Sequence, residues 1–91
     1  MSELQLRVLE ELRRIAKRDL EFEGALEPTM SLRDDLQLDS MGLTIVAVGL
    51  ENTFRVKLDE EDAGELVTVA DFLSLVERRV IEARLAEAGA A

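Results

Sequence analysis

The sequence predicts an all-α fold, and three of its features lead to that class. Apolar residues recur at helical spacing along three separate stretches, and no alternating strand pattern persists. The apolar residues are mainly aliphatic, with three Phe, no Trp and no Tyr, which favours packed helices. Because 91 residues can build one modest core, we expect a single domain over residues 1–86, followed by a flexible tail at residues 87–91.

The first helix is predicted from about Glu3 to about Arg18. Ser2, with Gln5 three residues later, has the pattern of a capping box at the start of a helix. Apolar residues then follow at helical spacing and define a face for the core: Leu4, Val8, Leu12 and Ile15.

Residues 19–39 have the character of a loop, with Gly24, Pro28, scattered acids and no sustained period. Loops of this length within a compact domain usually serve a function. We expect the apolar residues of the loop to anchor it to the core: Leu26, Met30, Leu32 and Leu36.

A second helix is predicted to start at Ser40 and to carry two apolar stripes. The first stripe is expected to face the core: Leu43, Val46, Ala47, Leu50 and Phe54. The second lies on the adjacent face: Met41, Thr44, Ile45 and Val48. This second stripe is either further core or a surface for a partner. Because one helix in so small a domain cannot easily bury both faces, we expect part of it to stay exposed.

The last third of the chain predicts a short helix and a long one. Acids from Asp59 suit the start of a helix, which Gly64 ends after little more than a turn. Thr68 with Asp71 has the pattern of a second capping box. The apolar residues that follow it are expected to face the core: Val69, Phe72, Leu73, Val76, Val80 and Leu85. The expected architecture is therefore three longer helices and one short helix, with a long loop between the first two.

The charge of the chain restricts its partners. The formal net charge is −9, and residues 21–62 alone carry a net −8. This charge disfavours nucleic acid and anionic membranes, and favours protein partners with basic surfaces. The chain has no cysteine, no apparent signal peptide and no apolar run long enough to cross a bilayer. We expect a cytoplasmic protein that is monomeric and does not insert into membranes.

Ser40 stands between an acidic residue and a long apolar run, and it has two interpretations. It is either the N-cap of the second helix or a handle for a covalent modification, and the two are compatible. A hydrolytic serine needs a base, but the chain has no His, its lysines are Lys17 and Lys57, and Gly-x-Ser-x-Gly is absent. We therefore expect a protein that is not an enzyme.

The acidic run from Asp59 to Asp62 is interpreted as a solvated helix start. A calcium loop of the EF-hand type needs Gly at its sixth position and Glu at its twelfth, and neither "DDLQLDSMGL" nor "DEEDAGEL" fits that spacing. No metal site is predicted.

The segment "LRDDLQLDSMGLTIVAVGLENTFRVKLDEEDAGELVTVADFLSLV" resembles the acyl carrier protein family without a gap, over roughly half the chain. Five elements of the family pattern are matched in order: Asp35-Leu36, Asp39-Ser40-Met41, Leu50 to Phe54, "LDEEDA", and Thr68 to Asp71. The resemblance implies a four-helix bundle of acyl-carrier type. It also implies a 4′-phosphopantetheine arm, donated by coenzyme A and attached by a phosphopantetheinyl transferase to Ser40, with Asp39 and Met41 beside it. The thiol of the arm holds acyl groups as thioesters.

The sequence departs from the family at two places. Family members usually have Gly where this chain has Gln37, so we expect a slightly different loop before Ser40. The family also sets acids on the second helix where this chain has Gly42 and Ile45, and only Glu51 is retained further along. We expect a more apolar partner surface, made of Met41, Thr44, Ile45, Val48 and Glu51, and a dedicated fatty acid, polyketide or other lipid pathway.

Two alternatives remain open from the sequence. One is a carrier of aminoacyl or peptidyl groups, which shares the same serine chemistry and differs in its partner enzymes. The other is a helical adaptor that binds partners without a covalent arm, with Ser40 serving only as a helix cap.

Overall fold

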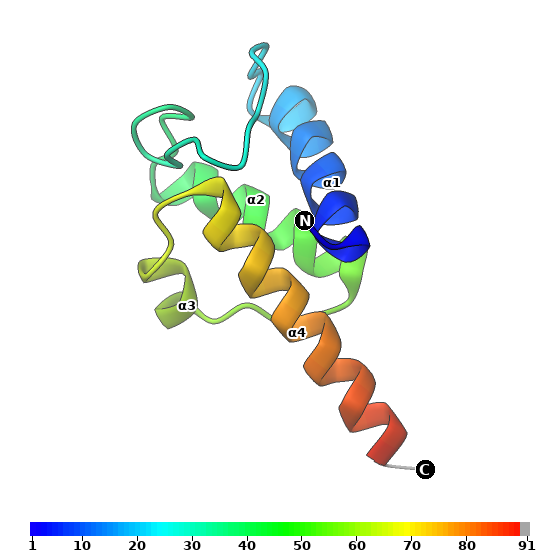
Figure 1. Ribbon diagram of the computed structural model, residues 1–91. Coiled ribbons are helices and arrows are strands. Elements are labelled where there is room, and N and C mark those ends of the chain that lie inside the picture. Colours follow the sequence, from blue (N-terminus) through cyan, green and yellow to red (C-terminus); the bar gives the residue numbers. More distant parts are fainter. Residues whose placement is uncertain (90–91) are drawn as a thin grey trace.

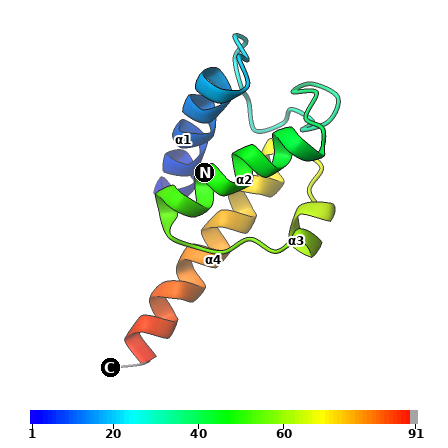
Figure 2. The same cartoon turned by 180° about the vertical axis from the view of Figure 1, so that it is seen from behind.

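The computed structural model describes residues 1–89, and over that range the regular elements of the chain are helices. In chain order they are α1 (Glu3–Asp19), α2 (Ser40–Phe54), α3 (Glu60–Gly64) and α4 (Val69–Gly89). α1 packs against both α2 and α4, as the two opposite views show (Figures 1 and 2). The predicted all-α class is confirmed, with three long helices forming the bundle and α3 adding a short segment of five residues.

The core lies between the three long helices and follows the predicted stripes closely. Phe72 of α4 is the largest of the fully buried side chains, and the predicted core faces of α1 and α2 are buried or half-buried. One prediction was wrong, because the side chain of Leu85 is 66% exposed. The second half of α4 projects past the ends of the other helices, so no element covers Leu85 there (Figure 1).

α1 and α2 approach each other closely at Gly49. A Cβ atom built at this position would lie 2.6 Å from Cδ1 of Ile15, which is fully buried on α1. That separation is well inside van der Waals contact, so the absence of a side chain at Gly49 permits the spacing of the two helices.

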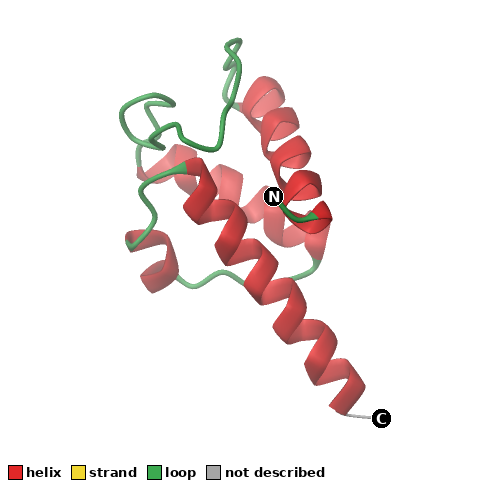
Figure 3. Ribbon diagram, viewed as in Figure 1, coloured by secondary structure: helices red, strands yellow, loops and turns green. Residues whose placement is uncertain are grey.

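The long loop between α1 and α2 is held in place at several points along its length (Figure 3). Leu26 and Leu32 are buried, as predicted, and Met30 and Leu36 pack half-buried against the core. The backbone N–H of Leu32 donates to the carbonyl of Val67 at 2.9 Å, next to an isolated antiparallel bridge between Ser31 and Thr68. The loop is thereby fastened to the start of α4.

The predicted helix caps form to different extents. In the capping box of α1, the Ser2 hydroxyl accepts a hydrogen bond from the Gln5 N–H at 3.1 Å. The Gln5 side chain donates instead to Glu77 of α4, so only one of the two bonds of this capping box is present. The second box is complete, since Thr68 Oγ1 accepts from the Asp71 N–H and the Asp71 carboxylate accepts from the Thr68 N–H. The Asp71 carboxylate also accepts from the Val67 N–H.

The C-terminal segment differs from the expected tail over part of its length. α4 continues to Gly89, so residues 87–89 are helical. Ala90 and Ala91, the remainder of the expected tail, lie outside the described residues.

Candidate functional site at the start of helix α2

The cap of α2 is Asp39, and the interpretation of Ser40 as the N-cap was wrong. Asp39 has an extended backbone, and its Oδ1 accepts from the Gly42 N–H at 2.7 Å. The carboxylate satisfies one of the free N–H groups at the helix start, which a cap residue must do. Ser40 is therefore the first residue of the helix, and capping does not occupy its hydroxyl.

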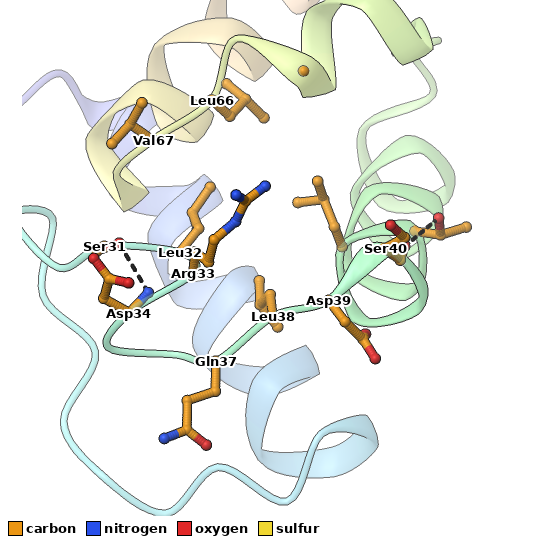
Figure 4. A pocket seen from close by; sticks show the side chains of 13 residues that line it. Ser31, Leu32, Arg33, Asp34, Gln37, Leu38, Asp39, Ser40, Leu66 and Val67 are labelled. Atoms are coloured by element: carbon orange, nitrogen blue, oxygen red, sulfur yellow. Dashed lines mark hydrogen bonds between the residues drawn. The ribbon is translucent and has the colours of Figure 1, made fainter.

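The Ser40 side chain is exposed, and among the residues that the structure describes its hydroxyl has no hydrogen-bond partner. The carbonyl of Ser40 does have one, because the Thr44 hydroxyl donates to it at 2.8 Å (Figure 4). The backbone of Ser40 is thus held by the helix while its Oγ faces solvent.

Ser40 opens on a hollow of about 1080 Å³ between the start of α2, the first loop and the segment before α4 (Figure 4). The hollow has apolar walls on both sides and a mixed polar rim. Its lining residues are Ser31, Leu32, Arg33, Asp34, Gln37, Leu38, Asp39, Ser40, Leu43, Thr44, Gly64, Leu66 and Val67. The site therefore places one free hydroxyl at the mouth of a partly apolar cavity.

The loop that leads into Ser40 contains a residue in an unusual backbone conformation. Gln37 has a φ of 54°, in the left-handed region that glycine adopts readily and other residues rarely do. The neighbouring turn is fixed by side chains, since Asp35 Oδ2 accepts from the Ser31 N–H at 2.7 Å. Gln37 thus adopts the kind of conformation for which the family's usual glycine is suited.

Neither a histidine nor a lysine lies beside Ser40 among its described neighbours. Lys17 lines a separate hollow formed by α1 and the first loop, and Lys57 does not line the hollow of Ser40. With no His in the chain, the site offers a hydroxyl without the partner that activates a nucleophilic serine.

The second apolar stripe of α2 is exposed to solvent. Met41 is 72% exposed, Val48 46% and Ile45 36%, and Thr44 is also exposed. The expectation that this stripe stays partly uncovered is confirmed. Gly42, by contrast, is buried, so the position two residues after Ser40 contributes nothing to the surface.

Glu51, the acid retained on α2, is engaged within the molecule. Its carboxylate is half-buried and accepts from the Leu58 N–H at 3.0 Å, which ties α2 to the segment before α3. The exposed face of α2 near Ser40 is thus mainly apolar.

Two carboxylates near the short helix have pKa values below the ordinary range of Asp. Arg79 of α4 donates a hydrogen bond to Asp62 of α3 at 2.6 Å, and this bond lowers the pKa of that carboxyl. For Asp71, the N–H groups of Thr68 and Val67 lower the pKa by stabilising the charged form. The Arg79–Asp62 bond ties α3 to α4, and the Asp71 bonds hold Val67, a residue that lines the hollow, at the start of α4.

A family model described as a phosphopantetheine attachment site matches residues 7–76. An acyl carrier protein from Solidesulfovibrio magneticus is 32% identical over 73 residues, which are 79% of this chain and 94% of that protein. The meromycolate extension acyl carrier protein of Mycolicibacterium aurum is 36% identical over 64 residues, which are 70% of this chain and 64% of that protein. The crystal structure of an acyl carrier protein from Thermotoga maritima shares the fold, with a TM-score of 0.79 at 15% identity, covering 88% of this chain and 94% of that one.

The fold and the site define a non-catalytic carrier with a covalently attached 4′-phosphopantetheine, which a phosphopantetheinyl transferase installs. The chain belongs to the acyl carrier protein family. No helix among residues 1–89 has the length and apolarity needed to span a membrane.

Sequence reasoning missed two parts of the site. The segment Leu66–Val67 forms the wall opposite α2, although it is more than 20 residues from Ser40 in the chain. Arg33 also lines the hollow, and its position within a strongly acidic stretch was a signal that could have singled it out.

Proposed function

We propose that Ser40 is the residue that carries the phosphopantetheine arm, and that the protein presents acyl thioesters to the enzymes of a dedicated lipid pathway. The observation that carries the proposal is the free, exposed hydroxyl of Ser40 at the first turn of α2. Because Asp39 supplies the cap, the hydroxyl can be esterified without removing the hydrogen bond that starts the helix.

The residues around Ser40 are chemically suited to a phosphopantetheine arm. A phosphate on Ser40 would lie at a helix start, where N–H groups and the helix dipole favour negative charge. Leu43 and Leu66 line the hollow and would offer apolar contacts to the part of the arm that follows the phosphate. When attached, the arm supplies a thiol that forms thioesters, a group that this cysteine-free chain lacks.

The chain's own residues hold and present the arm, and they catalyse no step. The proton of the Ser40 hydroxyl would leave to a base of the transferase, since the neighbouring carboxylate of Asp39 is engaged as the cap of α2. Helix α2 fixes the point of attachment, and the acidic surface around it attracts enzymes with basic docking surfaces.

The loading test uses purified protein, coenzyme A, magnesium and a broad-specificity phosphopantetheinyl transferase. We expect the intact mass of the wild type to rise by one phosphopantetheine group, and that of Ser40→Ala to stay unchanged. A Ser74→Ala variant, which removes an exposed serine of α4, is the control and should be loaded like the wild type. Loading of Ser40→Ala would refute the assignment of Ser40.

The proposal of a dedicated pathway rests on the exposed apolar face of α2, made of Met41, Ile45 and Val48. Such a face suits partner enzymes whose docking surface is apolar with a basic rim, and differs from a docking face that relies on acids. One relative is named for a particular process, meromycolate extension, which agrees with a dedicated role.

The test of the pathway is genetic. Expressed in place of a housekeeping acyl carrier protein, this chain should be loaded with its arm but support fatty acid synthesis poorly. Complementation at full rate would contradict a dedicated role. The mass of the cargo isolated from cells distinguishes acyl from aminoacyl groups.

A further inference from the structure

Arg33 is the one positively charged residue among the described residues that line the hollow of Ser40. It lies seven residues before Ser40 in the first loop, between buried Leu32 and exposed Asp34. Figure 4 shows its side chain extending from the loop into the hollow, on the side that faces α2. A guanidinium and a free hydroxyl therefore open on the same cavity.

The guanidinium of Arg33 takes part in none of the ion pairs between described side chains. Among the described side chains, no carboxylate lies within 4.0 Å of it, although the loop is rich in acids. The two acids that line the hollow do not pair with it, and one of them, Asp39, caps α2. The donors of Arg33 remain available to a ligand.

The backbone beneath Arg33 is firmly held. Leu32 is buried, its N–H donates to the carbonyl of Val67 at 2.9 Å, and its own carbonyl accepts from the Leu38 N–H at 3.0 Å. Arg33 therefore starts from a fixed point on the wall opposite α2, which limits the conformational entropy lost when its side chain binds a ligand.

We propose that Arg33 binds the phosphate of the arm on Ser40 and holds the first part of the arm against the hollow. This inference rests on the proposed attachment at Ser40. The phosphodiester is a singly charged anion with two free oxygens, which the planar guanidinium matches with two parallel hydrogen bonds. Residues 21–62 carry a net −8, so a local cation also reduces the repulsion that this field exerts on the phosphate.

The test compares holo proteins, each verified by intact mass, using the phosphorus NMR resonance of the arm as the probe. We expect Arg33→Gln to shift this resonance from its wild-type position toward its position in urea-unfolded holo protein. Arg33→Lys, which keeps the charge but not the bidentate geometry, should shift it part of the way. Arg84→Gln removes the same charge from the far end of α4 and should leave the resonance unchanged (Figure 1).

The melting temperature provides a second readout. Attachment of the arm should raise the melting temperature of the wild type by a few degrees relative to the apo protein. This increase should be absent in Arg33→Gln, and added salt should reduce it in the wild type. An identical resonance and an identical rise in the wild type and Arg33→Gln would overturn the role of Arg33 while leaving attachment intact. Absence of a mass gain in the wild type would overturn the attachment and this inference together.

Discussion

Asp39 and Ser40, adjacent at the start of α2, differ in how their side chains are used. Asp39 caps the helix and Ser40 presents its hydroxyl, so the capping role and the chemical role that we propose belong to different side chains. A serine that capped the helix would have its oxygen engaged with a backbone N–H. The order Asp-Ser keeps that oxygen free, which is what a site of covalent modification requires.

Gln37, like Glu21 and Arg55, is a non-glycine residue whose backbone lies in the left-handed region. A non-glycine residue in the left-handed region destabilises the folded state by about 1 kcal/mol. Replacing Gln37 by glycine removes this strain, but glycine also has more conformational freedom in the unfolded chain, which offsets part of the gain in stability. We predict that Gln37→Gly raises the free energy of unfolding by about 0.5 kcal/mol. Urea denaturation of the apo protein measures this change.

The matched control for this prediction is Gln37→Ala. Alanine also removes the polar side chain, but it keeps the Cβ atom that makes the left-handed conformation unfavourable. We therefore expect no gain from alanine. Equal effects of glycine and alanine would show that the backbone conformation is not the cause.

At the scale of elements, the spacing of α1 and α2 depends on one glycine. Gly49→Ala raises the helix propensity of this position by about 1 kcal/mol. Its Cβ atom, however, would lie so close to buried Ile15 that one of the two side chains must move. Such overpacking costs about 1–3 kcal/mol. We predict a net loss of stability of about 1 kcal/mol. The loss is measured by urea denaturation.

A double-mutant cycle tests the cause of that loss. Ile15→Val removes Cδ1, the atom nearest to the new Cβ, so in its presence Gly49→Ala should cost less than it does alone. Gly64→Ala, whose Cβ would have no neighbour within 4 Å, serves as the control and should not couple to Ile15→Val. Strict additivity of Gly49→Ala and Ile15→Val would exclude the contact as the cause.

At the scale of the whole molecule, the acidic chain depends on a few carboxylates that are bonded in the folded state. Asp71 holds the segment at Val67 and Thr68 against α4, and its pKa is lower in the folded than in the unfolded state. A lowered folded pKa means that the stabilisation is present above the unfolded value, about 3.9, and is lost as the pH falls through the folded value.

We predict that Asp71→Asn lowers the free energy of unfolding at neutral pH, and that its difference from the wild type shrinks below about pH 4. Urea denaturation across the range from neutral to acid pH measures both variants. Glu87→Gln, which removes an exposed carboxylate near the end of α4, is the control and should follow the wild type. A difference that stays constant with pH would mean that Asp71 acts through packing rather than through its charge.

The sequence by itself determined the all-α class, the core faces and the Thr68 cap, and it singled out Ser40 as the hydroxyl that we propose for modification. These features depend on local spacing and on residue type, which are fully present in the chain. Helical periodicity, however, does not say where a neighbouring helix ends. For that reason Leu85 was assigned to the core, although α4 continues past the elements that would cover it.

Only the tertiary structure decided the surroundings of Ser40. The structure shows that Asp39, and not Ser40, caps α2. It also shows that Leu66 and Val67 lie opposite α2, where they line a hollow together with Arg33. These relations join segments that are distant along the chain, and they depend on how the first loop is fastened to the start of α4. The spacing of residues along a chain carries no direct record of such contacts, because their geometry arises only when the helices pack.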